Sequence, residues 1–287
     1  MLTAFSTIAL CLTAGYVFAW VRRDLDQRAL IALVLDVLMP ALILDSLIST
    51  EISAAEFGRL VLATVVVVAL LIVPCIPVAR LVGMRLGAFA PPVLFMNSGF
   101  IGIPLLGLLG GAAGTACAVT YDQVQTLMIF SLGLALVAGR SSGWRILHEM
   151  GRSPIVWSIA AAALVRGVGL ELPEGLRHAV RFVGAGASPV ALVLVGVAMR
   201  QLPVRLTRSV VAATLLRIVG GAAAGFLVAR LLHLEGTPRM TVTLLSALPS
   251  AVFSYVLASR YDAEPAYAAA TVVATTAVGL PLLYFLT

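Results

Sequence analysis

The chain alternates between long apolar runs and short segments that carry most of its charges. A helix of about 20 apolar residues is long enough to cross the hydrocarbon core of a bilayer. Runs of this kind predict transmembrane helices, numbered 1 to 10 in chain order, over residues 3–21, 29–50, 59–82, 88–110, 114–139, 153–170, 176–199, 207–232, 239–259 and 264–286. They use nearly all of the 287 residues, so the sequence predicts an all-α integral membrane protein of ten transmembrane helices.

The composition agrees with this pattern. Apolar residues make up 61% of the chain, charged residues only 11%, and the mean hydropathy is +1.08. A soluble domain carries about a quarter charged residues, so this chain lacks the polar side chains to cover a surface in water. The lipid bilayer is therefore the expected solvent. No basic segment precedes the first apolar run, so we expect that run to be retained rather than cleaved as a signal peptide.

The basic residues are all arginines, and they are unevenly divided between the two sides of the predicted membrane. Twelve lie in or beside the connections after helices 1, 3, 5, 7 and 9, and six lie on the opposite side. Cytoplasmic connections carry the excess of basic residues, so both termini should face the periplasm of a bacterial inner membrane. This placement explains the formal charge of +6 without a nucleic-acid partner, since no basic stripe is interleaved with aromatic residues.

The two halves of the chain resemble each other weakly. VARLVGM at 78–84 matches VARLLHL at 228–234 at an offset of 150, and MPALIL matches SPVALVL at an offset of 149. A unit of five helices is odd in number, so a second copy must enter the membrane from the opposite side. We therefore predict a first five-helix repeat at 1–139, a cytoplasmic linker at 140–152 and a second, inverted repeat at 153–287.

Predicted helices 4 and 9 carry helix-breaking residues at corresponding places. Helix 4 contains NSGFIGIPLLGLLGG, with Gly99, Gly102 and Pro104 near its middle, and helix 9 contains SALPSAVFS, centred on Pro249. Proline has no backbone N–H and clashes with the carbonyl four residues earlier, so both helices should be unwound near mid-membrane.

Such breaks can be ordinary kinks or part of a site. Unwound backbone is tolerated in lipid only where it is buried in protein or lines a wet cavity. A single kink, as expected at Pro74 and Pro77, is a structural feature, whereas a matched pair in the two halves points to a transport site. Polar residues that flank the breaks are candidate substrate ligands, namely Asn97, Ser246, Ser250 and Ser254.

Arg217 is expected near the middle of helix 8, about 10 residues from its start. Because an arginine keeps its charge, it needs a negative partner there. Two interpretations stay open. Arg217 is a clamp for an anionic substrate such as a carboxylate, or it forms a permanent ion pair with Asp36, Asp45 or Asp122.

Two aspartates are further candidates, because ionisable residues inside a membrane are costly and functional by default. Asp122 lies in helix 5, with Gln125 one turn later on the same face, and is either a proton carrier or the fixed partner of Arg217. Asp36 lies one turn before Pro40, so it either caps backbone groups freed by that proline or is a second candidate for proton coupling.

Other chemistries have no support in the sequence. Cys11, Cys75 and Cys117 are scattered in apolar stretches, which is typical of inert packing residues. The three histidines have no metal-ligand spacing, and the chain has no HExxH, GxSxG or P-loop motif. We expect no enzyme activity, no cofactor and no metal.

Several stretches resemble the auxin efflux carrier family, which includes plant auxin exporters and bacterial malonate-permease-like carriers. They are GYVFAWVRRDLDQRALIALVLDVLMPALIL at 15–44, NSGFIGIPLL at 97–106, the segment around Asp122 and Gly133, and ALPSAVFSYVLASRYD at 247–262. The resemblance implies two inverted five-helix repeats whose broken helices 4 and 9 cross at mid-membrane, with substrate bound beside the crossing. Bile-acid-type sodium symporters have a similar plan. Asp36 is a departure, since many relatives have an uncharged or amide residue there.

Together these features predict a secondary active transporter that moves a small organic anion, such as a carboxylate, by alternating access, with a proton as coupling ion. The candidate substrate-binding residues are Asn97, Gly102, Pro104, Asp122, Gln125, Arg217, Ser246, Pro249, Ser250 and Ser254, and the proton-coupling candidates are Asp122 and Asp36. A sodium-coupled symporter of the bile-acid type and a membrane sensor that does not transport are the alternatives. The sequence determines neither the substrate nor whether the chain forms a homodimer.

Overall fold

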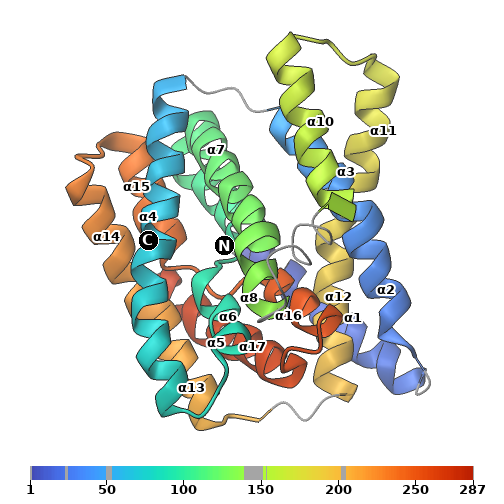
Figure 1. The fold of residues 1–287 in the computed structure, drawn as a ribbon, viewed down its shortest axis with the longest axis vertical. Coiled ribbons are helices and arrows are strands. Elements are labelled where there is room, and N and C mark those ends of the chain that lie inside the picture. Colours follow the sequence, from blue (N-terminus) through green and yellow to red (C-terminus); the bar gives the residue numbers. More distant parts are fainter. Residues whose placement is uncertain are drawn as a thin grey trace.

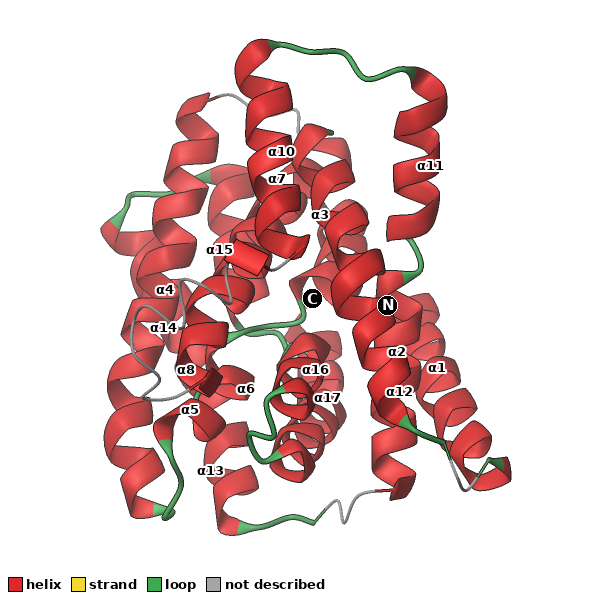
Figure 2. Cartoon of the chain, turned by 45° about the vertical axis from the view of Figure 1, so that its right-hand side comes forward, coloured by secondary structure: helices red, strands yellow, loops and turns green. Residues whose placement is uncertain are grey.

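The computed structural model describes residues 2–22, 25–49, 54–138, 151–152, 154–201 and 205–286. Within these residues the chain is helical apart from short connections and one isolated pair of extended residues (Figures 1 and 2). Most of the predicted linker at 140–152 lies outside the described residues.

The elements have the following bounds in chain order. They are α1 (Leu2–Val21), α2 (Gln27–Leu33), the π-helical turn η1 (Val34–Leu38), α3 (Met39–Ile48), α4 (Ala54–Leu81), α5 (Leu86–Phe89), α6 (Pro91–Leu94), η2 (Ser98–Gly102), α7 (Ile103–Met128), η3 (Ile129–Gly133), α8 (Leu134–Ala138), α10 (Pro154–Val168), α11 (Glu174–Gly184), α12 (Ala187–Gln201), α13 (Arg208–Leu215), η4 (Leu216–Gly220), α14 (Gly221–Leu231), α15 (Gly236–Ser246), α16 (Val252–Arg260) and α17 (Pro265–Leu286).

Several of these stretches have the length and apolar character of membrane spans. Among the described residues five qualify, at 27–45, 55–81, 105–138, 174–201 and 208–231, and shorter apolar helices lie at 9–21, 154–168 and 265–279. The chain is therefore a multi-pass helical membrane protein, and the count of ten crossings stays a prediction.

Widened, π-helical turns lie in predicted helices 2, 4, 5 and 8, as η1, η2, η3 and η4. Predicted helix 2 runs continuously from α2 through η1 to α3, and predicted helix 8 runs from α13 through η4 to α14. The first widening has a clear cause, because the ring of Pro40 would clash with the carbonyl of Asp36 in a regular α-helix. Asp36 thus lies in η1, at the point where the ladder is disturbed.

The stretch from η2 to α7 folds back on itself at Gly111, within the predicted connection between helices 4 and 5. Gly111 has φ 58° and ψ −142°, a conformation that only glycine adopts without strain. A Cβ at Gly114 would collide with the backbone carbonyl of Leu106, so the two arms of this hairpin pack backbone to backbone. The hairpin brings the second arm of α7 alongside η2.

The break in predicted helix 4 lies earlier than the sequence indicated. Residues 95–97 are not helical, whereas Gly99 and Gly102 belong to η2 and Pro104 lies in the first turn of α7. Pro104 lies inside the continuous helical stretch that begins at Ser98 and directly follows the π turn η2, as Pro40 follows η1, so it accounts for a widened turn and not for the break at 95–97. The break in predicted helix 9 falls at 247–251 around Pro249, as expected.

Predicted helix 7 has a break that the sequence analysis missed. It divides into α11 and α12 at residues 185–186. Gly184 lies directly against the backbone of Leu42 in α3, where a Cβ would be 2.7 Å from the Leu42 nitrogen. This close contact holds the end of α11 against α3.

The helices form two bundles that lie side by side (Figure 1). The flanking bundle comprises α1, α2, η1, α3, α10, α11 and α12, on the right of the view. The crossing bundle comprises α4 to α8, with η2 and η3, and α13 to α17, with η4. Within the flanking bundle, α1 and α12 touch through Gly15 and Gly196, where any Cβ would meet the other helix's backbone. This contact makes the flanking bundle a tightly joined unit.

The short sequence match between the halves coincides with matching helix ends. α4 ends at Leu81 and α14 at Leu231, and each is closed by a hydrogen bond of the same kind, Met84 N–H to the Ala79 carbonyl and Leu234 N–H to the Ala229 carbonyl. The next helices begin at 86 and 236. All three features share the offset of 150.

Candidate functional site

The two broken segments cross and pair with each other inside the crossing bundle. Met96 and Ser250 form an antiparallel bridge. The Asn97 N–H donates to the Pro249 carbonyl at 2.8 Å, and the Ala251 N–H donates to the Phe95 carbonyl at 2.8 Å. These bonds satisfy backbone groups that unwinding leaves free, which is the requirement for irregular backbone inside a membrane.

Side chains from the second half of the chain donate to the carbonyl groups at the end of the half-helix before the first break, where the Pro91 carbonyl also accepts the Phe95 N–H at 3.2 Å. A helix leaves its last four carbonyls without intrahelical donors. The hydroxyls of Tyr267, Ser254 and Ser250 donate to the carbonyls of Phe89, Pro91 and Pro92, and Arg217 donates to that of Val93. The four donors are buried.

Arg217 joins the ends of both broken helices. Its Nη1 donates to the Val93 carbonyl at 2.7 Å, and its Nη2 donates to the carbonyl of Ser246, the last residue of α15. Arg217 is 0% exposed, and no ion pair links it to an acid in the part of the chain that the structure describes. Carbonyl ends carry the negative pole of a helix dipole, so two such ends provide the partner that its charge requires.

The opposite charge lies at the start of the other half-helix. The Ser98 hydroxyl donates to Asp122 Oδ1 at 2.7 Å, and a Cβ at Gly99 would be only 3.1 Å from the same oxygen. The carboxyl group therefore faces the first turn of η2, whose amide end favours negative charge. The hairpin at Gly111 is what brings Asp122 back to this position.

Gln125, one turn beyond Asp122, is the most conspicuous polar group without a function in the fold. Its side chain is 1% exposed, and neither its amide nitrogen nor its amide oxygen has a hydrogen-bond partner among the described residues. A buried amide without partners costs about 1–3 kcal/mol. Such a group persists most readily where a ligand uses it.

A polar seam joins the two bundles along α16. The Tyr255 hydroxyl donates to Gln27 Oε1 in α2, and Gln27 Nε2 donates to Gln201 Oε1 in α12 at 2.6 Å. Farther along α16, Arg260 Nη1 lies 3.1 Å from both carboxylate oxygens of Asp36 in η1. The contacts between the bundles along α16 therefore include polar ones that ligands and water can replace, beside apolar packing.

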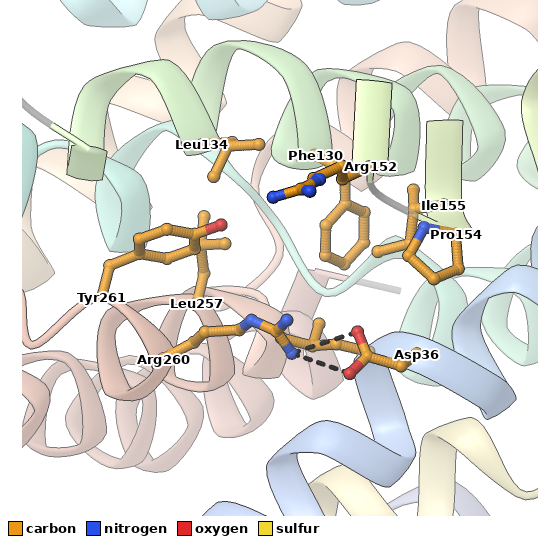
Figure 3. A pocket seen from close by; sticks show the side chains of 10 residues that line it. Asp36, Phe130, Leu134, Arg152, Pro154, Ile155, Leu257, Arg260 and Tyr261 are labelled. Atoms are coloured by element: carbon orange, nitrogen blue, oxygen red, sulfur yellow. Dashed lines mark hydrogen bonds and ion pairs between the residues drawn. The ribbon is translucent and has the colours of Figure 1, made fainter. Parts of the chain in front are cut away.

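A cavity of about 330 Å³ opens beside this ion pair (Figure 3). Arg152 points into it from the side opposite the Asp36–Arg260 pair. The remaining lining is apolar or aromatic and comprises Leu35, Phe130, Leu134, Pro154, Ile155, Leu257 and Tyr261. Cavities of this size accommodate small organic ligands.

The structure thus does not bring all the predicted site residues together. Arg217, Ser250 and Ser254 serve the carbonyl ends of the crossing, and Ser246 joins them through its carbonyl and through its hydroxyl, 3.0 Å from Tyr121 Oη. Asn97 and Pro249 pair across the breaks, and Gly102 packs against Leu245 and Leu248. Asp122 and Gln125 lie together, whereas Asp36 lies in the seam.

Ser98, Tyr267 and Arg260 also belong to the site, although they were not predicted from the sequence. Ser98 adjoins Asn97, so its place beside the break was a usable signal. Arg260 was counted only as an orientation residue, although it ends the half-helix that follows Pro249. Tyr267 gave no signal, because its partner is a backbone carbonyl. No group of three or more histidine, cysteine, aspartate or glutamate side chains that could hold a metal occurs among the described residues.

A multi-pass helical protein with two paired helix breaks around buried charges has the architecture of a membrane transporter. The chain belongs to the family described as membrane transport protein, the auxin efflux carrier-like family, whose profile matches residues 2–153 and 145–287. The resemblance inferred from the sequence is thereby confirmed.

Two curated relatives carry similar descriptions. An uncharacterized transporter of Methanothermobacter thermautotrophicus is 29% identical over 175 residues, which cover 59% of this chain and 56% of the relative. An uncharacterized transporter of Methanocaldococcus jannaschii is 23% identical over 204 residues, which cover 68% of this chain and 66% of the relative. The aligned parts thus span between half and two thirds of the length of these relatives.

Proposed function

We propose that the chain is a secondary active transporter that moves a small organic anion by alternating access. The observation that carries the proposal is the pairing of two broken helices at Met96 and Ser250, beside the partnerless amide of Gln125. Paired breaks in two repeats are the usual setting of a transport site. The proposed plan is ten helices in two inverted five-helix repeats, and the matching helix ends at an offset of 150 support it.

The moving parts in this proposal are the two bundles. The flanking bundle is held by backbone contacts at Gly15 and Gly196, whereas the seam along α16 includes polar side-chain contacts through Gln27, Tyr255 and Arg260 beside its apolar packing. Polar interfaces between units within a chain permit relative motion. The crossing bundle would move as one body, because Arg217 and the hydroxyl donors tie its two breaks together.

Asp122 is the proposed coupling group, and Arg217 is assigned a structural role. Both fork nitrogens of Arg217 are engaged by carbonyls, so it is not offered as the anion clamp. Asp122 occupies the amide end of η2 that would otherwise favour an anion. A proton bound to Asp122 removes its charge, and the substrate anion can then approach Ser98 and Gln125. Asp36 has Arg260 as partner and remains the second candidate for coupling.

The orientation proposed is that of a bacterial inner-membrane protein with both termini in the periplasm, as the division of the arginines indicates. A sodium-coupled symporter is the second candidate, since Ser98 Oγ and Asp122 Oδ1 lie 2.7 Å apart beside the break and hard cations prefer oxygen ligands.

Flux through proteoliposomes tests the proposal. The purified full-length chain should exchange at least one radiolabelled carboxylate from a panel across the membrane, saturably and faster with the same solute on the far side. A proton gradient imposed without sodium should drive accumulation under the first candidate, and only a sodium gradient should do so under the second. Binding without flux would identify a sensor and overturn the proposal.

A further inference from the structure

The ion pair between Asp36 and Arg260 differs from an ordinary surface pair in where it lies. It joins η1 of the flanking bundle to α16 of the crossing bundle, and both side chains are 38% exposed to the cavity beside them. The pair between Asp45 and Arg181, at 3.4 Å, lies within the flanking bundle between α3 and α11. Only the first pair has to break if the bundles separate.

The geometry of the pair leaves part of Arg260 unused. Both Asp36 oxygens contact the single nitrogen Nη1, so the carboxylate does not engage two nitrogens of the guanidinium (Figure 3). A guanidinium has five N–H donors, and its strongest arrangement with a carboxylate uses two parallel bonds from two nitrogens. A free carboxylate in the cavity can therefore make a better contact with Arg260 than Asp36 makes.

The rest of the cavity suits the remainder of such a ligand. Arg152 and Arg260 carry two positive charges and Asp36 one negative charge, which leaves a net charge of +1 on the lining. The other lining side chains are apolar or aromatic, including Phe130 and Tyr261. One negative charge attached to an apolar body fits both features.

We propose that this cavity binds a monocarboxylate with an apolar body, whose carboxylate group binds Arg260. The ligand displaces Asp36 and thereby breaks the ion pair between the bundles. The inference rests on the proposed function, in that the released bundles are those that move during transport. Asp36 acts as an internal competitor: it holds Arg260 while the cavity is empty, and it is repelled when a second carboxylate arrives.

Binding to the purified full-length protein in detergent tests the proposal, with benzoate and hexanoate as probes and benzamide and hexanamide as uncharged counterparts. Asp36→Asn should bind the acids about tenfold more tightly than the wild type, because the competitor has lost its charge. Arg260→Gln should bind them at least about tenfold more weakly, and Asp36→Asn/Arg260→Gln should resemble Arg260→Gln alone. The amides should bind every variant equally weakly.

The matched control is the pair inside the flanking bundle. Asp45→Asn and Arg181→Gln should leave the affinity for benzoate unchanged, and melting temperatures should show that all variants fold. Equal weakening by Asp36→Asn and Arg260→Gln would mean that the pair only holds the fold and would overturn the proposal, as would amides that bind as well as acids. If the binding pattern holds but proteoliposomes show no flux, the transport function fails and the carboxylate site stands. If flux occurs and Arg260→Gln binds normally, only the site fails.

Discussion

The two ends of the crossing handle charge in opposite ways. At the carbonyl end, Arg217 is 0% exposed, and each of its fork nitrogens donates to a helix end. At the amide end, Asp122 has one hydroxyl donor from Ser98, and the neighbouring Gln125 has no partner. The first end is a joint in which both terminal nitrogens of Arg217 are occupied by the fold, and only its Nε has no partner among the described residues. The second retains polar groups for something else, and it is there that we expect ligand and coupling ion to act.

The largest effect should come from breaking the joint. Arg217→Met should lower the free energy of unfolding by about 3–5 kcal/mol, because the carbonyls of Val93 and Ser246 lose their donors in a buried place. Thermal melting in detergent measures this. Arg230→Met is the control, since Arg230 lies in the same continuous helical stretch but at its exposed end, 5.8 Å from the ring of Phe226. An Arg217→Met protein that melts like the wild type would remove the joint from the account.

Asp122→Asn should change stability by less than about 1 kcal/mol, because the amide oxygen still accepts the Ser98 hydroxyl. It should abolish proton-driven accumulation while leaving exchange of solute. If Asp122 were instead the fixed partner of Arg217, the change would strand a buried cation. Adding Arg217→Gln would then restore stability. We expect no such restoration, so the double variant should melt like Arg217→Gln alone.

Gln125→Leu should separate stability from transport. Removing an amide without partners should leave the melting temperature unchanged or raise stability by about 1 kcal/mol, while exchange falls at least about tenfold. Thr120→Val, on the same arm of α7, removes only a hydroxyl bonded to the carbonyl of its own helix turn and should leave exchange intact. Normal exchange by Gln125→Leu would show that its missing partners have no functional meaning.

Replacing Pro249 and Pro104 by alanine should reduce solute exchange by different amounts, and the Pro104 change should have the smallest effect. Pro249→Ala should reduce exchange severalfold, because it restores a helix-forming residue in the middle of the 247–251 break. Pro104→Ala should leave exchange near the wild-type rate, since Pro104 lies inside the helical stretch that follows the break and does not unwind residues 95–97. Equal losses in both variants would return Pro104 to the site.

Local signals in the sequence predicted much of the fold. Apolar runs located the helices, and Pro249 located one break. Arg217 was noticed because it lies far from both ends of its predicted helix. The partners could not be predicted in the same way, because Arg217 binds the carbonyl of Val93, a backbone atom with no sequence signature that lies 124 positions away. The same holds for Ser250 and Ser254, which were predicted to bind substrate but instead donate to the carbonyls of a distant helix end. Asp36 and Arg260 could both be recognised as charged residues in the sequence, but only the fold shows that they form a pair.

In the proposed mechanism solute moves because the crossing bundle moves against the flanking bundle, and cross-linking across the seam tests this motion. Gln27→Cys with Tyr255→Cys, in a Cys11→Ala background, places one thiol on each bundle where the side chains now share a hydrogen bond. Joining them with a bifunctional thiol reagent should abolish carboxylate exchange in proteoliposomes. The same reagent across Asp45→Cys and Arg181→Cys, inside the flanking bundle, should leave exchange intact. Undiminished exchange through the protein cross-linked between bundles would contradict the account.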